Sequence, residues 1–366
     1  MVVPGALNDL ARGLAVPVPL AGQLVTVAAW AMALAAPLLA ALLSRHDRRR
    51  LLAFSLAWYA AGHALSAAMP GLASLLPVRA ATVLAASVFT PAAAAVVGAL
   101  ATSERRGEAI TFIFLGWSLA SVLGMPIAAY VAETAGWRAA FVLVALLSAG
   151  AAVAAWRHTP QGLRAPALTL RDLGGVLSRP ALMAIVAVTA LSASGQFTLF
   201  GYMAPYYANV LGTRPAETSA LFLWFGVFGL IGSVAMTRWV DRLGAGAAAT
   251  AGIAAMAVSL LAWPWAGGVA AMALVLTPWA LGCFSSNSAQ QARLVAAAPA
   301  LAGVLVSLNT SAMYLGQGIG AALGGVLLGL HGYAALAPAA AVGLVLATGL
   351  SAWLVRRGRP GPAAAA

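Results

Sequence analysis

The sequence contains no lysine, and each of its 20 basic residues is an arginine. A phosphate-binding loop of the G-x-x-x-x-G-K-[ST] type requires that lysine, so an ATP-driven pump is excluded for this chain alone. Cysteine is almost as scarce, because Cys283 is the only one and no disulfide framework can form. No H-E-x-x-H motif, cysteine pair or aspartate pair within an apolar stretch indicates a metal site or a membrane protease. These absences argue against an enzyme and predict no metal or cofactor.

Charge is scarce too, since only 8% of the residues are charged whereas 63% are hydrophobic. A helix needs about 20 consecutive apolar residues to cross the ~30 Å core of a bilayer, where the backbone must satisfy its own hydrogen bonds. Eleven apolar stretches meet or approach that length. They cover residues 20–43, 51–69, 77–101, 110–131, 138–156, 180–203, 218–237, 247–265, 267–287, 301–327 and 334–355. The sequence therefore predicts an all-α membrane protein with about eleven transmembrane helices.

The arginines gather in alternate connections between these stretches. One set of connections carries runs such as residues 48–50, whereas the other set holds only Arg12, Arg138 and Arg214. By the positive-inside rule, the arginine-rich connections, the segment 157–179 and the C-terminus face the cytoplasm. The net charge of +12 would suggest nucleic-acid binding in a soluble protein, but here it reflects membrane topology.

Two landmarks recur along the chain at nearly the same spacing. Gly136–Trp137 recurs 196 residues later as Gly332–Tyr333, and Ser44–Arg45 recurs 197 residues later as Asp241–Arg242. Parallel repeats of this kind are a construction rule of secondary transporters. The predicted domains are an N-terminal helical half (residues 1–157), a cytoplasmic linker (158–179) and a C-terminal helical half (180–366).

The same spacing has a consequence for the N-terminus. The stretch 180–203 begins the second half, and most of its counterpart in the first half would lie before Met1. We therefore expect the first helix to be truncated, with residues 2–14 forming its outer end and the loop that follows. A start codon assigned too late is a better explanation than a natural truncation, because a cavity-lining helix is costly to lose.

The segment 237–244, TRWVDRLG, keeps Asp241, Arg242 and Gly244 of a G-x-x-x-D-R-x-G pattern. Its first-half counterpart keeps Arg45 but lacks the aspartate. On these residues the whole chain resembles the major facilitator superfamily, and within it bacterial drug:proton antiporters and arabinose-type sugar efflux permeases. The resemblance implies two tandem helical bundles and a gate at the cytoplasmic end, where a carboxylate would bind a facing helix N-terminus. The alternative is that these charges only mark the cytoplasmic side.

A weaker resemblance concerns the small residues of two stretches. Gly124 and Pro126 lie where antiporters of this family have a glycine- and proline-rich span, and Gly316, Gly320 and Gly324 form the corresponding face of the penultimate stretch. Small residues at four-residue spacing let helices approach closely, and proline bends a helix. We expect packing to be their main role, and rocking between the halves would use the same contacts.

Polar side chains within the stretches are expected to face a cavity, because they are costly in lipid. Arg79 matches an arginine that the family resemblance implicates in proton transfer, although its position also allows it to snorkel outward. His63 is the only histidine within a stretch and could carry protons, although a lone histidine is more often a packed polar residue. Further candidates for the substrate pathway are Gln196, Tyr202, Asn287, Asn309 and Gln317.

No aspartate or glutamate falls inside a complete stretch, so the sequence offers no membrane-embedded carboxylate for coupling. The chain is predicted to be a monomeric secondary transporter of the bacterial inner membrane that binds no nucleic acid. It would export a small organic solute, a drug or a sugar, by alternating access coupled to protons. The alternative is a non-transporting membrane sensor or an inactive, truncated relic of a transporter.

Overall fold

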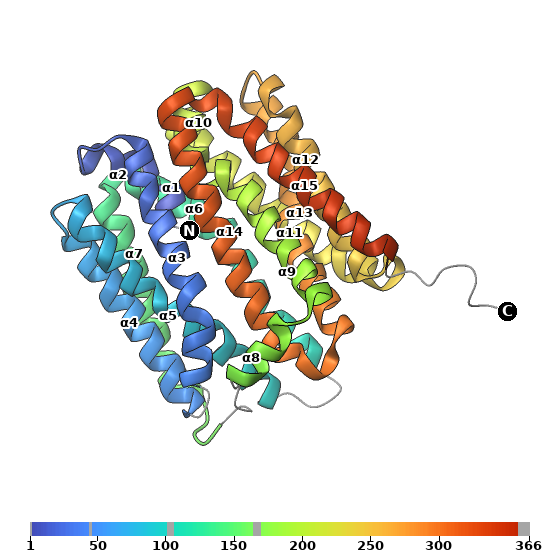
Figure 1. Ribbon diagram of the computed structural model, residues 1–366. Coiled ribbons are helices and arrows are strands. Elements are labelled where there is room, and N and C mark those ends of the chain that lie inside the picture. Colours follow the sequence, from blue (N-terminus) through green and yellow to red (C-terminus); the bar gives the residue numbers. More distant parts are fainter. Residues whose placement is uncertain (1, 44–45, 101–105, 164–169, 358–366) are drawn as a thin grey trace.

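The computed structural model describes residues 2–43, 46–100, 106–163 and 170–357, and the regular structure within these ranges is entirely helical (Figure 1). The helices are α1 (Val2–Gly5), α2 (Leu7–Gly13), α3 (Val18–Leu42), α4 (Arg48–Ala68), α5 (Leu72–Leu100), α6 (Arg106–Ala135), α7 (Trp137–His158), α8 (Leu170–Leu177), α9 (Pro180–Phe200), α10 (Met203–Val210), α11 (Pro215–Leu243), α12 (Ala245–Ala262), α13 (Val269–Ala297), α14 (Ala302–His331) and α15 (Leu336–Arg357), with 3-10 turns at Trp263–Trp265, Pro299–Leu301 and Tyr333–Ala335. Within the described ranges, 10 segments are long and apolar enough to cross a membrane, and α6 adds the shorter apolar segment Val122–Ala135. The predicted all-α membrane fold is confirmed.

Local chemistry accounts for several helix boundaries. Helices α3, α9 and α11 each have a proline in the first turn, where the backbone N–H has no helical partner to lose. Asp47 caps α4 by accepting a hydrogen bond from the backbone N–H of Arg50 at 3.2 Å. Gly136, Gly244 and Gly332 have φ angles of 84°, 79° and 73°, a region that favours glycine. The glycines that recur in the sequence, Gly136 and Gly332, thus share a left-handed φ at the α6–α7 and α14–α15 connections.

The long helices form two groups that lie side by side (Figure 1). We call α1–α7 the N-terminal bundle and α9–α15 the C-terminal bundle. Within the first, α4 packs against α5 and α7, and α3 packs against α5. Within the second, α9 packs against α14 and α15, and α13 packs against α11 and α12. The bundles meet along two seams, one between α3 and α14 and the other between α6 and α11.

The two ends of the molecule differ in charge. The α4–α5, α6–α7 and α14–α15 connections lie with α2 and α10 at one end, which we call the arginine-poor end. Helix α8 and the α3–α4 and α11–α12 connections lie at the opposite, arginine-rich end (Figure 1). This alternation follows from each long helix crossing the whole bundle.

Apolar burial also differs between the two ends. At the arginine-poor end, one core contains residues of both bundles, including Leu7 and Phe141 from the first and Tyr207 and Trp263 from the second. Toward the arginine-rich end, the described residues form separate cores. One lies within the N-terminal bundle, and two lie among α8 and the C-terminal bundle. Among the residues whose side chains are described, apolar cores therefore join the two bundles at the arginine-poor end and stay within one bundle, or within that bundle and α8, toward the arginine-rich end.

Residues 2–13 form two short helices at the arginine-poor end. Helix α1 contacts α6 and α10, and α2 contacts α3, α7 and α10. Val3, Leu7 and Leu10 are buried. The Asn8 side-chain amide donates a hydrogen bond to the Ala204 carbonyl oxygen at 3.3 Å, which links the two bundles. The segment expected at the outer end of a first helix thus helps to close this end of the molecule.

Candidate functional site

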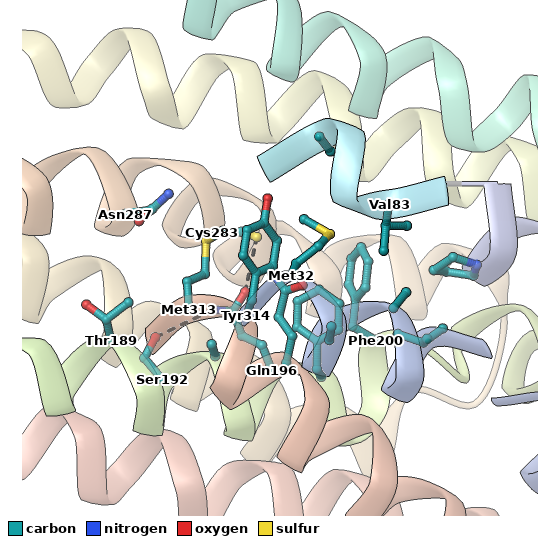
Figure 2. A pocket seen from close by; sticks show the side chains of 18 of the residues that line it. Met32, Val83, Thr189, Ser192, Gln196, Phe200, Cys283, Asn287, Met313 and Tyr314 are labelled. Atoms are coloured by element: carbon teal, nitrogen blue, oxygen red, sulfur yellow. Dashed lines mark hydrogen bonds between the residues drawn. The ribbon is translucent and has the colours of Figure 1, made fainter. Parts of the chain in front are cut away.

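A cavity of about 250 Å³ lies between the two bundles, midway along the long helices. Helices α1, α3, α4 and α5 line it from the N-terminal bundle, and α9, α12, α13 and α14 line it from the C-terminal bundle. Figure 2 shows side chains of both bundles directed into this space. Because both bundles contribute to its wall, any relative movement of the bundles would reshape the cavity.

Most of the polar residues that line the cavity come from the C-terminal bundle. Ser192 and Gln196 lie one helical turn apart on α9, with the Gln196 amide nitrogen 3.5 Å from the Ser192 hydroxyl (Figure 2). The thiol of Cys283 on α13 donates to the Gln196 side-chain oxygen at 3.1 Å. Asn287 lies one turn further along α13 and also lines the cavity, as does Gln317 on α14. These groups offer both hydrogen-bond donors and acceptors to a polar ligand.

The apolar part of the cavity lining comes from both bundles. Met32 on α3 and Val83 on α5 are buried and belong to a small cluster that Tyr314 of α14 also contacts. Phe197 and Phe200 on α9 lie 5.1 Å apart, measured between ring centroids, and line the same cavity. An apolar wall that faces a few directed polar groups is the usual composition of a small-molecule site.

Arg79 is the charged residue among the described lining residues, and His63 contacts it from outside the cavity wall. The guanidinium Nη1 of Arg79 lies 3.1 Å from Nε2 of His63, whose Nδ1 lies 2.9 Å from the Tyr59 carbonyl oxygen. An arginine can only donate, so Nε2 accepts and the imidazole proton lies on Nδ1, where it donates to Tyr59. His63 is fully buried and is neutral in this arrangement. Its ring also contacts Tyr59 and Phe141.

The predicted pathway residues divide into two groups. The cavity brings together Arg79, Gln196, Asn287 and Gln317, and His63 contacts Arg79 from outside the cavity wall. Tyr202 and Asn309 do not line it.

Both residues outside the cavity are engaged elsewhere. Tyr202 lies beyond the end of α9, and its hydroxyl donates to the Ala321 carbonyl oxygen at 2.8 Å. The side-chain oxygen of Asn309 accepts a hydrogen bond from the Thr189 hydroxyl at 2.5 Å. That bond ties α14 to α9 and leaves Thr189, which sequence reasoning missed, at the cavity wall.

Cys283 is a second residue that sequence reasoning missed, because a lone cysteine is usually an inert apolar residue. The sequence nevertheless contains an indication of its place in the cavity, because Cys283, Asn287 and Gln290 are spaced so that they share one face of α13. Gln290 also lines the cavity and donates to the Ile185 carbonyl oxygen at 2.7 Å.

The predicted gate lies at the arginine-rich end, and only part of it can be placed. Arg45 lies outside the described residues. Asp241 falls near the end of α11, but its side chain is not among those described. Arg242 is exposed, and Gly244 ends α11 with its φ of 79°. The role of Asp241 in a gate at the cytoplasmic end remains a prediction.

The first-half loop makes a contact that the repeat pattern did not indicate. One Asp47 oxygen accepts from the backbone N–H of Gly162 at 2.6 Å, and the N–H of Arg48 donates to the Leu163 carbonyl oxygen at 3.0 Å. Partial burial disfavours the charged form of Asp47, but hydrogen bonds from the Gly162 and Arg50 backbone outweigh it and lower the pKa of this carboxyl below 3.8. The hydrogen bonds from Gly162 to Asp47 and from Arg48 to Leu163 connect the α3–α4 loop to the segment that follows α7.

The glycines on α14 lie against α9. A Cβ atom added to Gly316, Gly320 or Gly324 would overlap the backbone carbonyl oxygens of Ala190, Ser194 and Thr198, respectively. These three positions therefore require glycine for the two helices to approach this closely.

Gly124 behaves differently from the packing expectation. Pro126 lies within α6 as expected, but a Cβ on Gly124 would meet no atom within 4 Å. The close contact on the α6–α11 seam comes instead from Gly226 of α11, which packs against Val122. The small residue at this seam therefore lies on the opposite helix from the one expected.

Comparisons with known proteins agree with this architecture. The sequence profile described as Major Facilitator Superfamily matches residues 1–321. The chain is 27% identical to the MFS-type transporter YbcL of Bacillus subtilis, with 94% of this chain and 89% of YbcL covered. It is 28% identical to a probable sugar efflux transporter of Mannheimia succiniciproducens, with 96% and 88% covered.

A solved structure of a D-xylose-proton symporter superposes with a TM-score of 0.75 at 16% identity, covering 96% of this chain and 92% of the symporter. At that identity the likeness supports the fold alone. Together with the profile match and the two bundles around a central cavity, it leads to one conclusion: the chain belongs to the Major Facilitator Superfamily of membrane transporters.

Proposed function

We propose that this transporter exports a small organic solute by alternating access and couples that movement to protons. The observation that carries the proposal is the central cavity, whose polar groups come from α9, α13 and α14 and whose cation comes from α5. A solute bound there contacts both bundles at once. Its binding free energy can therefore depend on how the bundles are arranged, which alternating access requires.

The lining favours a small, polar solute with an apolar face. The cavity volume of about 250 Å³ is just below the ~300–1,000 Å³ typical of drug-sized sites. Ser192, Gln196 and Asn287 provide hydrogen bonds suited to hydroxyl groups, and Phe197 and Phe200 provide an aromatic surface. Relatives described as probable sugar efflux transporters support a sugar-like solute over a bulky drug.

The distribution of the described apolar cores supports an opening of the cavity toward one end of the molecule. One core joins the bundles at the arginine-poor end, whereas separate cores lie toward the arginine-rich end. By the positive-inside rule the arginine-rich end is cytoplasmic. We therefore assign this conformation to the inward-facing state, in a multi-pass protein of the inner membrane with a cytoplasmic C-terminus.

His63 and Arg79 offer a route for proton coupling. In the observed arrangement Nε2 of His63 accepts the hydrogen bond from Arg79 at 3.1 Å. Protonation of His63 would place a proton on Nε2 and remove this acceptor, and would set two cations side by side. Protonated His63 is therefore incompatible with the observed position of Arg79. We expect the proton and the solute to bind in alternation.

The test uses purified protein in liposomes that contain a pH-sensitive dye. We expect at least one solute from a panel of sugars, sugar acids and small aromatic drugs to trigger proton movement across the membrane. Ser192→Trp should abolish that movement, because the indole would fill the cavity. Leu346→Trp is the matched control, since Leu346 is 58% exposed on the outer face of α15. Solute binding without any solute-dependent flux would indicate the alternative, a non-transporting sensor.

A further inference from the structure

We propose that the transported solute is a small organic anion whose negatively charged group, such as a carboxylate, binds to Arg79. This inference rests on the proposed function and names the chemical class of its substrate. The charge of the cavity is not balanced by the described part of its own lining. Among its described lining residues Arg79 carries a formal charge, and neither aspartate nor glutamate lines the wall.

The carboxylates of the chain are placed away from this cation. Of the 8 acidic residues, Asp9 pairs with Arg12, Glu217 pairs with Arg214, and Asp47 binds the backbone of Gly162. Glu133 is exposed near the end of α6. The other four, Glu104, Glu108, Asp172 and Asp241, lie outside the described side chains, and in the sequence all four fall in or beside arginine-rich connections.

The immediate neighbours of Arg79 do not neutralise it. His63 is a neutral acceptor for Nη1, the neutral phenol of Tyr59 interacts with the guanidinium, and the Phe141 ring centroid lies 6.0 Å from the guanidinium carbon. The residue is only 6% exposed, and its Nε has no hydrogen-bond partner among the described residues. A buried guanidinium with a free donor binds planar anions such as carboxylates well, because its donors match them in geometry as well as in charge.

The rest of the cavity fits an anion that also carries hydroxyl groups. Ser192, Gln196 and Asn287 lie on the wall from the C-terminal bundle, so they would bind the uncharged part of the solute. The low dielectric of a membrane interior strengthens the attraction between Arg79 and an anion. An uncharged solute of the same shape would leave the cation uncompensated. The geometry thus favours sugar acids or hydroxy acids over neutral sugars.

The single cysteine provides a test that does not require the solute to be known. Cys283 lines the same cavity as Arg79, and it is the only cysteine in the chain. Its thiolate attacks alkyl methanethiosulfonates to form a mixed disulfide and release methanesulfinate. We would compare the 2-sulfonatoethyl reagent, an anion, with the 2-(trimethylammonium)ethyl reagent, a cation of similar size. Rates would be measured by mass spectrometry on protein in nanodiscs and divided by the rates with a free thiol.

We expect the anionic reagent to react roughly tenfold faster than the cationic one after this correction, equivalent to ~1.4 kcal/mol. Arg79→Gln should abolish the preference, and Arg79→Lys should retain most of it. Arg293→Gln is the matched control. Arg293 is a buried arginine on α13 that does not line the cavity and instead donates to the Ser351 hydroxyl at 3.1 Å.

The possible outcomes separate the two proposals. Equal corrected rates for both reagents, or a preference that survives in a folded Arg79→Gln protein, would overturn the anion assignment and leave transport intact. If neither reagent modified Cys283 in nanodiscs, the cavity would not connect to water. The proposed function would then fail, and the anion assignment with it. Should Arg79→Gln not fold, the wild-type and Arg79→Lys rates still decide the question.

Discussion

At the scale of single residues, His63 combines two roles that mutations can separate. As an acceptor it holds Arg79 at the cavity wall, and as a base it would accept a proton. A glutamine in its place could still accept a hydrogen bond through its amide oxygen but could not be protonated at physiological pH. An alanine would remove both functions.

We therefore expect His63→Gln to retain solute exchange in the absence of a pH gradient, within about threefold of the parent. The same variant should lose transport driven by a pH gradient, whereas His63→Ala should lose both activities. Exchange and gradient-driven uptake would be measured on the same liposome preparation. Gradient-driven transport by His63→Gln at the parent rate would show that the proton passes elsewhere.

Sequence reasoning located part of the site at this scale, for a physical reason. Arg79, Gln196 and Asn287 could be predicted because large polar groups are costly in lipid and so tend to face a cavity. Cys283 and Thr189 escaped prediction, because small side chains of this kind are tolerated on any face of a membrane helix. Their place in the cavity depends on how α13 and α9 are rotated, which only the packed structure determines.

At the scale of helices, the contact between α14 and α9 is the one most sensitive to side-chain size. Its three glycines face backbone oxygens of α9 rather than flexible side chains, so an added methyl group cannot be accommodated by a change of rotamer. Gly329 lies on the same helix, but there an added Cβ would come no closer than 4.0 Å to Pro19.

Gly320→Ala should destabilise the protein by about 1–3 kcal/mol, because the added methyl group forces α14 away from α9. Gly329→Ala is the matched control and should be neutral, or stabilising by up to about 1 kcal/mol, since alanine favours a helix over glycine. Thermal unfolding in detergent, followed by tryptophan fluorescence, would measure both. Equal midpoints for the two variants would contradict the close packing.

The long helices were predictable and several short ones were not. Twenty apolar residues give a strong signal, so the eleven predicted stretches overlap the long helices of the structure. Helix α8 lies in the segment predicted as a polar linker and buries Val176 against α9 and α14. Helix α10 follows a break after Phe200 that hydrophobicity alone does not reveal. Contacts with neighbouring helices, rather than local composition, stabilise such short segments.

At the scale of the whole molecule, the arginine distribution sets the orientation in the membrane. A phosphatase that is active only outside the cytoplasm, fused after Arg357 at the arginine-rich end, should be inactive. The same enzyme fused after Gly267, in the connection between α12 and α13 at the arginine-poor end, should be at least about tenfold more active. Enzyme activity normalised to the amount of each fusion would be measured in cells. Strong activity of the C-terminal fusion would reverse the assignment of the two ends.

The shared core at the arginine-poor end also biases the resting equilibrium. Opening that end requires α1 and α2, which carry the buried residues Val3, Leu7 and Leu10, to separate from α10, and exposing apolar surface to water costs about 2.5 kcal/mol per 100 Å². Among the described side chains, the cores at the opposite end already stand apart, so closing that end separates no apolar core. An empty transporter should therefore rest in the conformation described here. A solute can reverse that preference only through tighter binding to the other state, so affinity measured on resting protein would underestimate the affinity of the state that opens at the arginine-poor end.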